Sequence, residues 1–343
     1  MTLEMKSPNS IVFGSCSIGA GHPVMVIAEI GINHEGDVAV ACEMVEKAVD
    51  AGADAIKLQT ADPNENYAPD TSSYAIYKKS FLGPEKTAKV FETARNLGVE
   101  PFTTTGLRTF DWVERLNPTG YKISSGTLTH IPLVKKAAQT GRPLLMSTGI
   151  ATHAEIDEAV AVAKASGAED LGLMQCTSLY PCPDECIDLA SIAWLREAYG
   201  CPVGFSDHTE DAQTAAFSVA AGATFIEKHF SLTPGKKSFD HHLSLGPEQF
   251  RKMVDDIRRV EKLLGSASKP LRAVEAAQHM RRCLVVLKTL KKGHELTEDD
   301  IGFMRTNDSQ GALLPSQFEC ILGARLAVDM EQFAVITADR IEI

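Results

Sequence analysis

Short apolar runs alternate with amphipathic stretches along the chain from residue 24 onward. The apolar runs cover residues 24–30, 54–59, 99–104, 120–124, 142–147, 170–175, 201–206 and 224–230. Stretches between them, such as 38–52, 153–167 and 211–222, place apolar residues three and four positions apart, and several end in glycine. This spacing predicts helices, whereas the short runs predict strands. Strands that alternate with helices favour a parallel sheet with crossover helices.

Eight such strands within about 250 residues predict the α/β class, as a (β/α)8 barrel of the TIM type. A doubly wound open sheet is the alternative, but no GxGxxG motif follows the first run. The pattern changes after residue 264. Residues 265–279, GSASKPLRAVEAAQH, have the Gly, Ser and Pro content of a linker. We therefore expect a barrel over 1–264, a linker over 265–279, and a small β-rich domain over 280–343.

Composition narrows the class of partner. The chain has 343 residues and a formal net charge of −11, which argues against a nucleic-acid surface but not against a local basic pocket. No apolar run approaches the ~20 residues that span a bilayer, and MTLEMKSPNS lacks the features of a signal peptide. The eight cysteines are scattered, which favours reduced thiols over a disulfide framework. We expect a cytoplasmic protein that binds neither membranes nor nucleic acid.

Polar residues follow every predicted strand. Active sites of such barrels lie at the carboxyl ends of the strands, where all these side chains meet. The candidates in chain order are Glu29, Asn33, His34, Lys57, Gln59, Thr103, Thr104, Thr105, Lys122, Ser125, Ser147, Thr148, Gln175, Thr177, Tyr180, Ser206, His208, Glu227, Lys228 and His229. Polar residues at all eight ends predict a binding site at the mouth of the barrel.

Lys57 and Lys122 lie inside their strands, in IKLQ and YKIS. An inward-facing lysine is costly unless it is paired with an anion. One interpretation is a structural ion pair with Glu29 or Glu227. The other is a ligand that carries a phosphate and a carboxylate, such as phosphoenolpyruvate, held by both lysines and by serine hydroxyls. The candidate hydroxyls are those of Ser125, Ser147 and Ser206.

His208 and His229 end neighbouring strands, in GFSDHT and IEKHF. Two imidazoles with open positions suit Mn²⁺, Fe²⁺, Co²⁺ or Zn²⁺ and leave room for a substrate carbonyl. Glu227 lies two residues before His229, hence on the same side of the strand, and is the candidate general acid or base. Asp207 points away from His208 and is expected to be structural. Asp37 is expected to cap the following helix.

Seven motifs occur in one order between residues 28 and 230: AEIGINHEGD, DAIKLQT, YKISSG, MSTG, CTSLYPCP, GFSDHT and IEKHF. They resemble the sialic acid synthase family, and the tail from residue 282 resembles the antifreeze-like (SAF) domain of that family. The resemblance covers nearly the whole chain. It implies a barrel that condenses phosphoenolpyruvate with an N-acylated hexosamine to give a nonulosonic acid and phosphate. The sugar stays open between N-acetylmannosamine and a 2,4-diacetamido-trideoxyhexose.

The resemblance also implies roles for individual residues. A divalent ion, Mn²⁺ first with Co²⁺ or Mg²⁺ as alternatives, would bind His208 and His229, and Glu227 and Glu29 would be catalytic. Phosphoenolpyruvate would contact Lys57, Thr104, Lys122, Ser125, Ser147, Ser178 and Ser206. The sugar would contact Glu29, Gln59, Tyr180 and Asp240, together with Arg305 from the partner subunit of a domain-swapped homodimer.

Three alternatives to this reaction stay open. One is condensation with an aldose phosphate, which needs a second anion site at Arg108 or Arg142. Another is a Schiff-base aldolase that uses Lys57 or Lys122 as nucleophile. The last is a non-catalytic sugar-binding protein.

Overall fold

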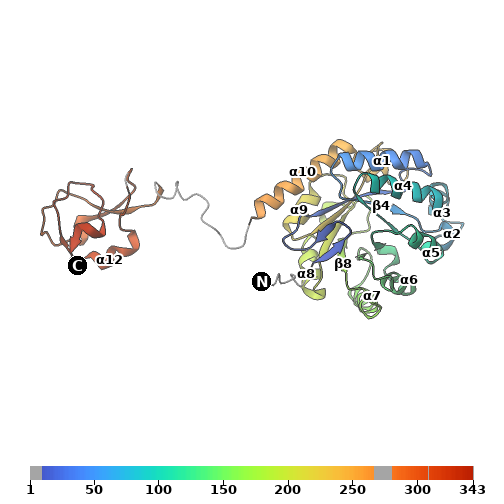
Figure 1. The fold of residues 1–343 in the computed structure, drawn as a ribbon, viewed down its shortest axis with the longest axis horizontal. Coiled ribbons are helices and arrows are strands. Elements are labelled where there is room, and N and C mark those ends of the chain that lie inside the picture. Colours follow the sequence, from blue (N-terminus) through green and yellow to red (C-terminus); the bar gives the residue numbers. More distant parts are fainter. Residues whose placement is uncertain (1–9, 266–279, 308, 343) are drawn as a thin grey trace. The chain divides into compact units, whose positions relative to one another are not determined.

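Eight parallel strands close into a barrel in a computed structural model that describes residues 10–265, 280–307 and 309–342 (Figure 1). Around the barrel the strands follow the order β10-β3-β4-β5-β6-β7-β8-β9. Their bounds are β3 Met25–Gly31, β4 Ala55–Gln59, β5 Glu100–Thr104, β6 Tyr121–Ile123, β7 Leu144–Ser147, β8 Leu171–Cys176, β9 Val203–Asp207 and β10 Phe225–His229. Each predicted run agrees with its strand to within two residues, so the predicted TIM-type barrel is confirmed.

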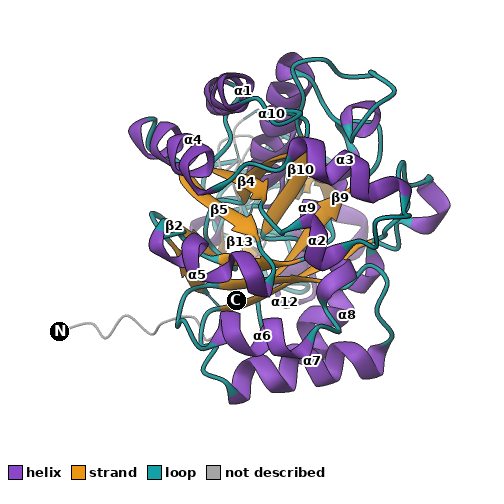
Figure 2. Cartoon of the chain, turned by 90° about the vertical axis from the view of Figure 1, so that its right-hand side faces the viewer, coloured by secondary structure: helices purple, strands orange, loops and turns teal. Residues whose placement is uncertain are grey.

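Helices surround these strands (Figure 2). They are α1 Val38–Asp50, α2 Pro63–Asn66, α3 Ser72–Ser80, α4 Pro84–Asn96, α5 Leu107–Arg115, α6 Ile131–Ala138, α7 His153–Ala165, α8 Ala190–Tyr199, α9 Thr214–Ala220 and α10 Pro247–Leu264. The 3₁₀ turns are η1 Ser125–Thr127, η2 Asp184–Cys186 and η3 His241–Leu243. Helix α1 begins where predicted, because the carboxylate of Asp37 accepts a hydrogen bond from the Ala39 amide at 2.8 Å.

A hairpin that the sequence pattern did not predict fills the other end of the barrel. Its strands, β1 Ile11–Phe13 and β2 Cys16–Ile18, are too short to show a clear alternation. Phe13 packs edge-on against Phe102 of β5, with 4.9 Å between the ring centroids. Because this end is filled by apolar side chains, polar groups inside the barrel gather toward the carboxyl ends of the strands.

Contacts divide the chain into two units, Met1–Gly265 and Ser266–Ile343. The second unit contains β11 Cys283–Val286, β12 Ile301–Met304, β13 Arg325–Leu326, β14 Ile341–Glu342, α12 Phe318–Ile321 and the 3₁₀ turns η4 Glu298–Asp300, η5 Pro315–Gln317 and η6 Ala338–Arg340. It is the expected small, β-rich domain, with a core of its own around Leu284, Leu296 and Ile336. Of the predicted linker, residues 266–279 lie outside the described residues.

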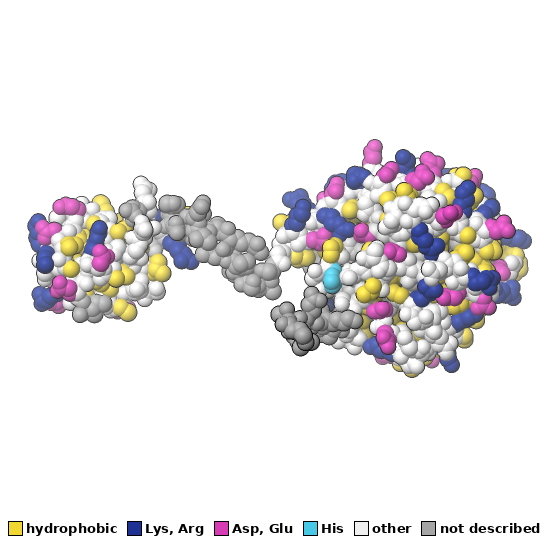
Figure 3. Space-filling model, viewed as in Figure 1, with side chains coloured by type: hydrophobic (Ala, Val, Ile, Leu, Met, Phe, Trp, Pro, Cys, Tyr) yellow, Lys and Arg dark blue, Asp and Glu magenta, His cyan; other side chains and the backbone are white. Residues whose placement is uncertain are grey.

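The surface carries charges of both signs. Figure 3 shows acidic and basic side chains interspersed over the face of the barrel unit that it displays. None of the helices in the described parts of the chain has the length and apolar content required to cross a membrane.

A buried ion pair lies on the side of the sheet that faces away from the barrel interior. The Nζ atom of Lys228 lies 2.9 Å from Oδ2 of Asp207 and donates to the carbonyl oxygen of Thr209 at 2.6 Å, and both ionised side chains are fully buried. This agrees with the expected structural role of Asp207. Its side chain points away from the cavity, whereas that of its neighbour His208 lines it.

Replacing Lys228 tests this structural role. Lys228→Met leaves the carboxylate of Asp207 buried without its cation, so we expect the free energy of unfolding to fall by about 3–5 kcal/mol. Lys228→Met/Asp207→Asn should recover a large part of that loss. Lys47→Met breaks the exposed 4.0 Å contact with Asp50 and serves as the control, with an expected change below about 0.5 kcal/mol. Urea unfolding measures all three, and a Lys228→Met cost no larger than the control contradicts the assignment.

Candidate functional site

A cavity of about 290 Å³ opens at the carboxyl ends of the strands. It brings together most of the predicted site residues. Those that line it are Lys57, Gln59, Thr104, Thr105, Lys122, Ser125, Ser147, Ser178, Tyr180, Ser206, His208, Glu227 and His229. The cavity therefore combines cations, hydroxyls, a carboxylate and two imidazoles in one space.

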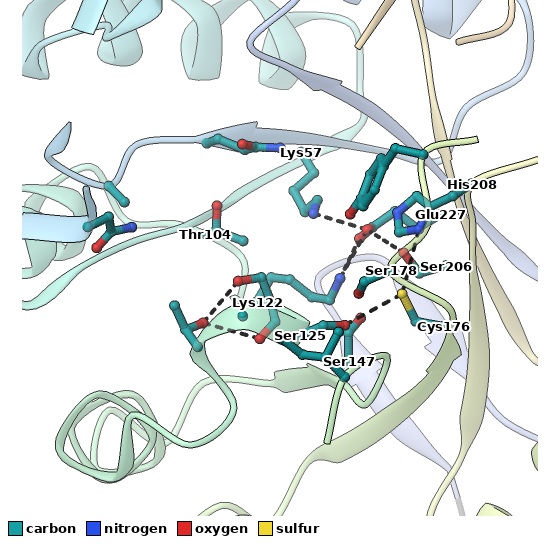
Figure 4. A pocket seen from close by; sticks show the side chains of 18 of the residues that line it. Lys57, Thr104, Lys122, Ser125, Ser147, Cys176, Ser178, Ser206, His208 and Glu227 are labelled. Carbon is teal, nitrogen blue, oxygen red and sulfur yellow. Dashed lines mark hydrogen bonds and ion pairs between the residues drawn. The ribbon is translucent and has the colours of Figure 1, made fainter. Parts of the chain in front are cut away.

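Glu227 lies between the two lysines (Figure 4). The Nζ atom of Lys57 is 3.0 Å from Oε1 of Glu227, and the Nζ atom of Lys122 is 2.9 Å from Oε2. Lys57 also contacts Oε2 of Glu29 at 2.9 Å. All four side chains are almost completely buried. The ion pairs of the first interpretation are thus present, and they place two ammonium groups against the cavity, where the second interpretation puts a ligand.

Burial and ion pairing shift the pKa values of these four groups in different directions. Burial raises the pKa of Glu29 above its usual value, although the neighbouring Lys57 opposes this shift. Burial would also raise the pKa of Glu227, but Lys122 and Lys57 together outweigh it and hold that pKa well below its usual range. Burial lowers the pKa of Lys122, and Glu227 offsets this only in part. Lys57, with two carboxylates, has a raised pKa. The positive charge of Lys122 is thus less fully balanced by carboxylates than that of Lys57.

Serine hydroxyls complete this half of the cavity. Ser206 donates to Oε1 of Glu227 at 3.0 Å, and the Ser125 hydroxyl accepts from the Gly149 amide at 2.9 Å. The Ser147 hydroxyl is buried and has no hydrogen-bond partner among the described residues. Leaving a buried hydroxyl unpaired costs about 1–3 kcal/mol, so its position suits the oxygen of a ligand.

Gly149 allows these hydroxyls to come together. A Cβ atom at this position would lie 2.7 Å from the Ser178 hydroxyl and 2.8 Å from the Ser125 hydroxyl. Any larger residue would push both away from the cavity.

The two imidazoles lie at the other side of the cavity, with 5.6 Å between their ring centroids. Nδ1 of His208 is 2.8 Å from the carbonyl oxygen of Thr177 and donates to it, which leaves Nε2 free to bind a metal. Nδ1 of His229 is buried without a hydrogen-bond partner in the described parts of the chain. Burial and the neighbouring His208 hold the pKa of His229 well below its usual value, so its ring is neutral, the form that binds metals.

These two rings fit a divalent ion with open coordination positions. The described residues contain no group of three or more His, Cys, Asp or Glu side chains arranged to hold a metal. Two protein ligands would therefore leave the remaining positions to water or substrate oxygens. The ring of Tyr180 packs against the ring of His208, with 4.1 Å between their centroids, and covers this side of the cavity.

Among the barrel residues with a predicted catalytic or sugar-binding role, Glu29 and Asp240 do not line the cavity. Glu29 lies beneath it, where it accepts a hydrogen bond from Nε2 of Gln59 at 2.9 Å. Asp240 lies in the loop after β10, and its Oδ2 atom is 3.7 Å from Nδ1 of His229. Arg305 is exposed directly after β12 in the second unit.

Two strand-end residues have structural contacts instead. Nε2 of Gln175 donates to the Ile187 carbonyl at 3.0 Å, and the Thr177 hydroxyl donates to the Cys186 carbonyl at 2.7 Å. Both bonds hold the loop that follows β8. Cys182 and Cys186 of this loop are free thiols that do not line the cavity.

One wall of the cavity is formed by residues that the sequence pattern did not predict. Tyr67 and Tyr77, from the segment between β4 and α4, stack with 4.6 Å between their ring centroids. The segment shows no strand pattern, and the tyrosines follow no strand directly, so nothing in the local sequence marked them as cavity residues. Other lining residues that were not predicted are Ala61, Asn66, Ser124, Gly126, Thr127, Ile150 and Cys176.

The sequence of the chain is similar to those of known proteins along most of its length. The model of the NeuB family matches residues 44–269, and the model of the SAF domain matches residues 281–342. The N,N'-diacetyllegionaminic acid synthase of Legionella pneumophila is 31% identical over 94% of this chain and 96% of its own length. The pseudaminic acid synthase of Helicobacter pylori is 32% identical over 93% of this chain and 98% of its own.

A solved structure is similar as well. It is the N-acetylneuraminic acid synthetase of Leptospira borgpetersenii in complex with citrate, which is 29% identical with a TM-score of 0.75. The superposition covers 79% of this chain and 95% of that one.

Proposed function

We propose a reaction for this chain on the premise that it belongs to the NeuB family and carries a SAF domain after its barrel. The enzyme condenses phosphoenolpyruvate with the open-chain aldehyde of an N-acylated hexosamine. The products are a nonulosonic acid and inorganic phosphate. The sugar is N-acetylmannosamine or a 2,4-diacetamido-trideoxyhexose, and the names of the two bacterial relatives favour the second kind.

One observation carries the proposal. Two buried ammonium groups and the unpaired hydroxyl of Ser147 face two imidazoles across a single cavity. Phosphoenolpyruvate carries a phosphate and a carboxylate, which suit the first group of donors. A divalent ion bound by His208 and His229, with Mn²⁺ favoured, would polarise the aldehyde oxygen as a Lewis acid.

Residues of the chain then serve each step. Lys122, Lys57 and the serine hydroxyls hold the anion so that C3 of phosphoenolpyruvate faces the aldehyde carbon, which it attacks. Because the bound anion shares the two lysines with Glu227, the pKa of Glu227 rises toward its usual value. Glu227 can then accept a proton from the water that adds at C2 and pass it to the alkoxide that the attack leaves on the sugar. Loss of phosphate from C2 leaves the 2-keto-3-deoxy acid, with the lysines beside the departing charge.

The aldose phosphate alternative finds little support. It needs a second cationic group at the cavity, and neither Arg108 nor Arg142 lines it. Arg142 is bound to Glu114 at 2.8 Å, and Arg108 lies 4.0 Å from Asp62. Neither of these two arginines therefore offers a free guanidinium to a phosphorylated sugar.

A phosphate-release assay tests the proposed reaction. We expect phosphate and a 2-keto acid in equal amounts from phosphoenolpyruvate with N-acetylmannosamine or a 2,4-diacetamido-trideoxyhexose, and none with aldose phosphates. His229→Ala controls for contaminating phosphatases. Release with an aldose phosphate alone, or no release with any sugar, contradicts the proposal. A pyruvate adduct on Lys57 or Lys122 after borohydride treatment would instead indicate a Schiff-base aldolase.

Metal removal tests the role of the imidazoles. A chelator should abolish activity and Mn²⁺ or Co²⁺ should restore it, since a bound ion supplies several kcal/mol of charge stabilisation. His208→Ala and His229→Ala should each lose at least about 100-fold in kcat, with unchanged circular dichroism. Full activity in protein shown by elemental analysis to be metal-free excludes the assignment.

Mixed dimers test the proposed role of Arg305. If Arg305 completes the partner's sugar site in a two-fold dimer, Arg305→Ala and His229→Ala homodimers are both nearly inactive. In a mixed dimer one site carries both defects and the other carries neither. Random re-pairing of equal amounts should then make roughly a quarter of all sites native. Co-expression with two different tags, followed by double purification, isolates the mixed species, and no recovery of activity there refutes the exchange.

A further inference from the structure

Asn33, in the loop after β3, has a role that the proposed reaction does not explain. Its side chain is buried, with 3% exposed, and makes three hydrogen bonds. Oδ1 accepts from the backbone amide of Asp240 at 3.1 Å. Nδ2 donates to the carbonyl oxygen of Phe230 at 3.0 Å and to the hydroxyl of Ser244 at 2.9 Å. One amide group thus joins the loop after β3 to two points of the loop after β10.

These bonds hold both backbone polar groups of Asp240. Its amide is bound by Asn33 directly, and its carbonyl oxygen accepts from the Ser244 hydroxyl at 2.6 Å. That hydroxyl is in turn oriented by Asn33. Because Phe230 directly follows His229, the same side chain ties Asp240 to the end of the strand that carries the imidazole.

The turn before Asp240 needs such support. Phe239 has a φ of 51°, in the left-handed region that non-glycine residues rarely occupy. Such a conformation costs about 1–3 kcal/mol and persists only when surrounding contacts impose it. If the turn relaxed, the carboxylate of Asp240 would leave its place 3.7 Å from Nδ1 of His229.

We propose that Asn33 is a positioning residue that holds the carboxylate of Asp240 beside His229 at the sugar end of the cavity, with Ser244 as a relay. The proposal rests on the proposed function for its kinetic consequence, since His229 would there hold the ion that meets the sugar aldehyde, and Asp240 lies beside His229. Its structural consequence, a fixed Asp240 backbone, does not depend on the identity of the substrate.

Kinetics of matched variants test the proposal. In Asn33→Ala we expect the KM for the sugar to rise on the order of tenfold, and the KM for phosphoenolpyruvate to change by less than about twofold. Ser244→Ala should change the sugar KM in the same direction by less. In an Asp240→Ala background, Asn33→Ala should add nothing further, because the two act through one carboxylate.

Ser231→Ala is the control for a purely structural effect. Ser231 is also buried in the loop after β10, and its hydroxyl lies 2.6 Å from Nδ1 of His241 without contacting Asp240. It should lower the melting temperature about as much as Asn33→Ala but leave the sugar KM unchanged. Equal effects of both variants on the sugar KM, or additive effects of Asn33→Ala and Asp240→Ala, overturn the proposal.

Hydrogen exchange supplies a readout without substrate. Residue-resolved exchange by mass spectrometry should show the Asp240 amide exchanging on the order of tenfold faster in Asn33→Ala and at the native rate in Ser231→Ala. An Asp240 amide that stays protected in Asn33→Ala overturns the proposal. If no sugar supports phosphate release, the proposed function fails while the exchange result still decides whether Asn33 fixes Asp240.

Discussion

Inside the barrel, Glu227 forms ion pairs with Lys57 and Lys122 and accepts a hydrogen bond from Ser206. The rest of the site is arranged around this buried carboxylate. Removing one partner of such a cluster costs several kcal/mol, whereas replacing the whole cluster with apolar residues is often neutral or stabilising. The cluster is therefore a poor solution if the barrel needs only stability. It fits the proposed function, in which a bound anion competes with Glu227 for the two lysines. Lys122, which has Glu227 as its carboxylate partner where Lys57 has two, is the cation best able to accept a ligand.

The barrel keeps these charges at one end. The hairpin of β1 and β2 packs Phe13 and its neighbours against the apolar side chains at the opposite end, so the interior changes from apolar to charged along its axis. Alternation along β9 and β10 separates the two kinds of ionic contact. Ser206, Glu227 and His229 face the cavity, whereas Asp207 and Lys228 pair on the outer side of the sheet. Stability and chemistry thus use neighbouring residues of the same strands.

The imidazole side of the cavity depends on loops more than on strands. His208 is oriented by the Thr177 carbonyl, and Asp240 reaches His229 from a turn whose backbone is held by Asn33 and Ser244. Tyr67 and Tyr77 come from the segment between β4 and α4. The half of the cavity that we propose to bind the anion is built on the strands or directly after them. The half proposed for the sugar also uses loops and short helices that follow the strands, whose length and composition can change without disturbing the barrel.

The sequence by itself determined the barrel, its strand bounds and the lysines, serines and histidines of the mouth. Apolar runs alternating with amphipathic stretches allow few other folds, and polar residues directly after strands must converge at one end. Tertiary structure alone decided that Lys57 and Lys122 share Glu227, that Glu29 lies beneath the cavity, and that β1 and β2 close the far end. It also placed Asn33 against Asp240, 207 residues away in the chain. Such contacts join residues that are far apart in the sequence and leave no local pattern, so only the folded barrel brings the partners within hydrogen-bonding distance.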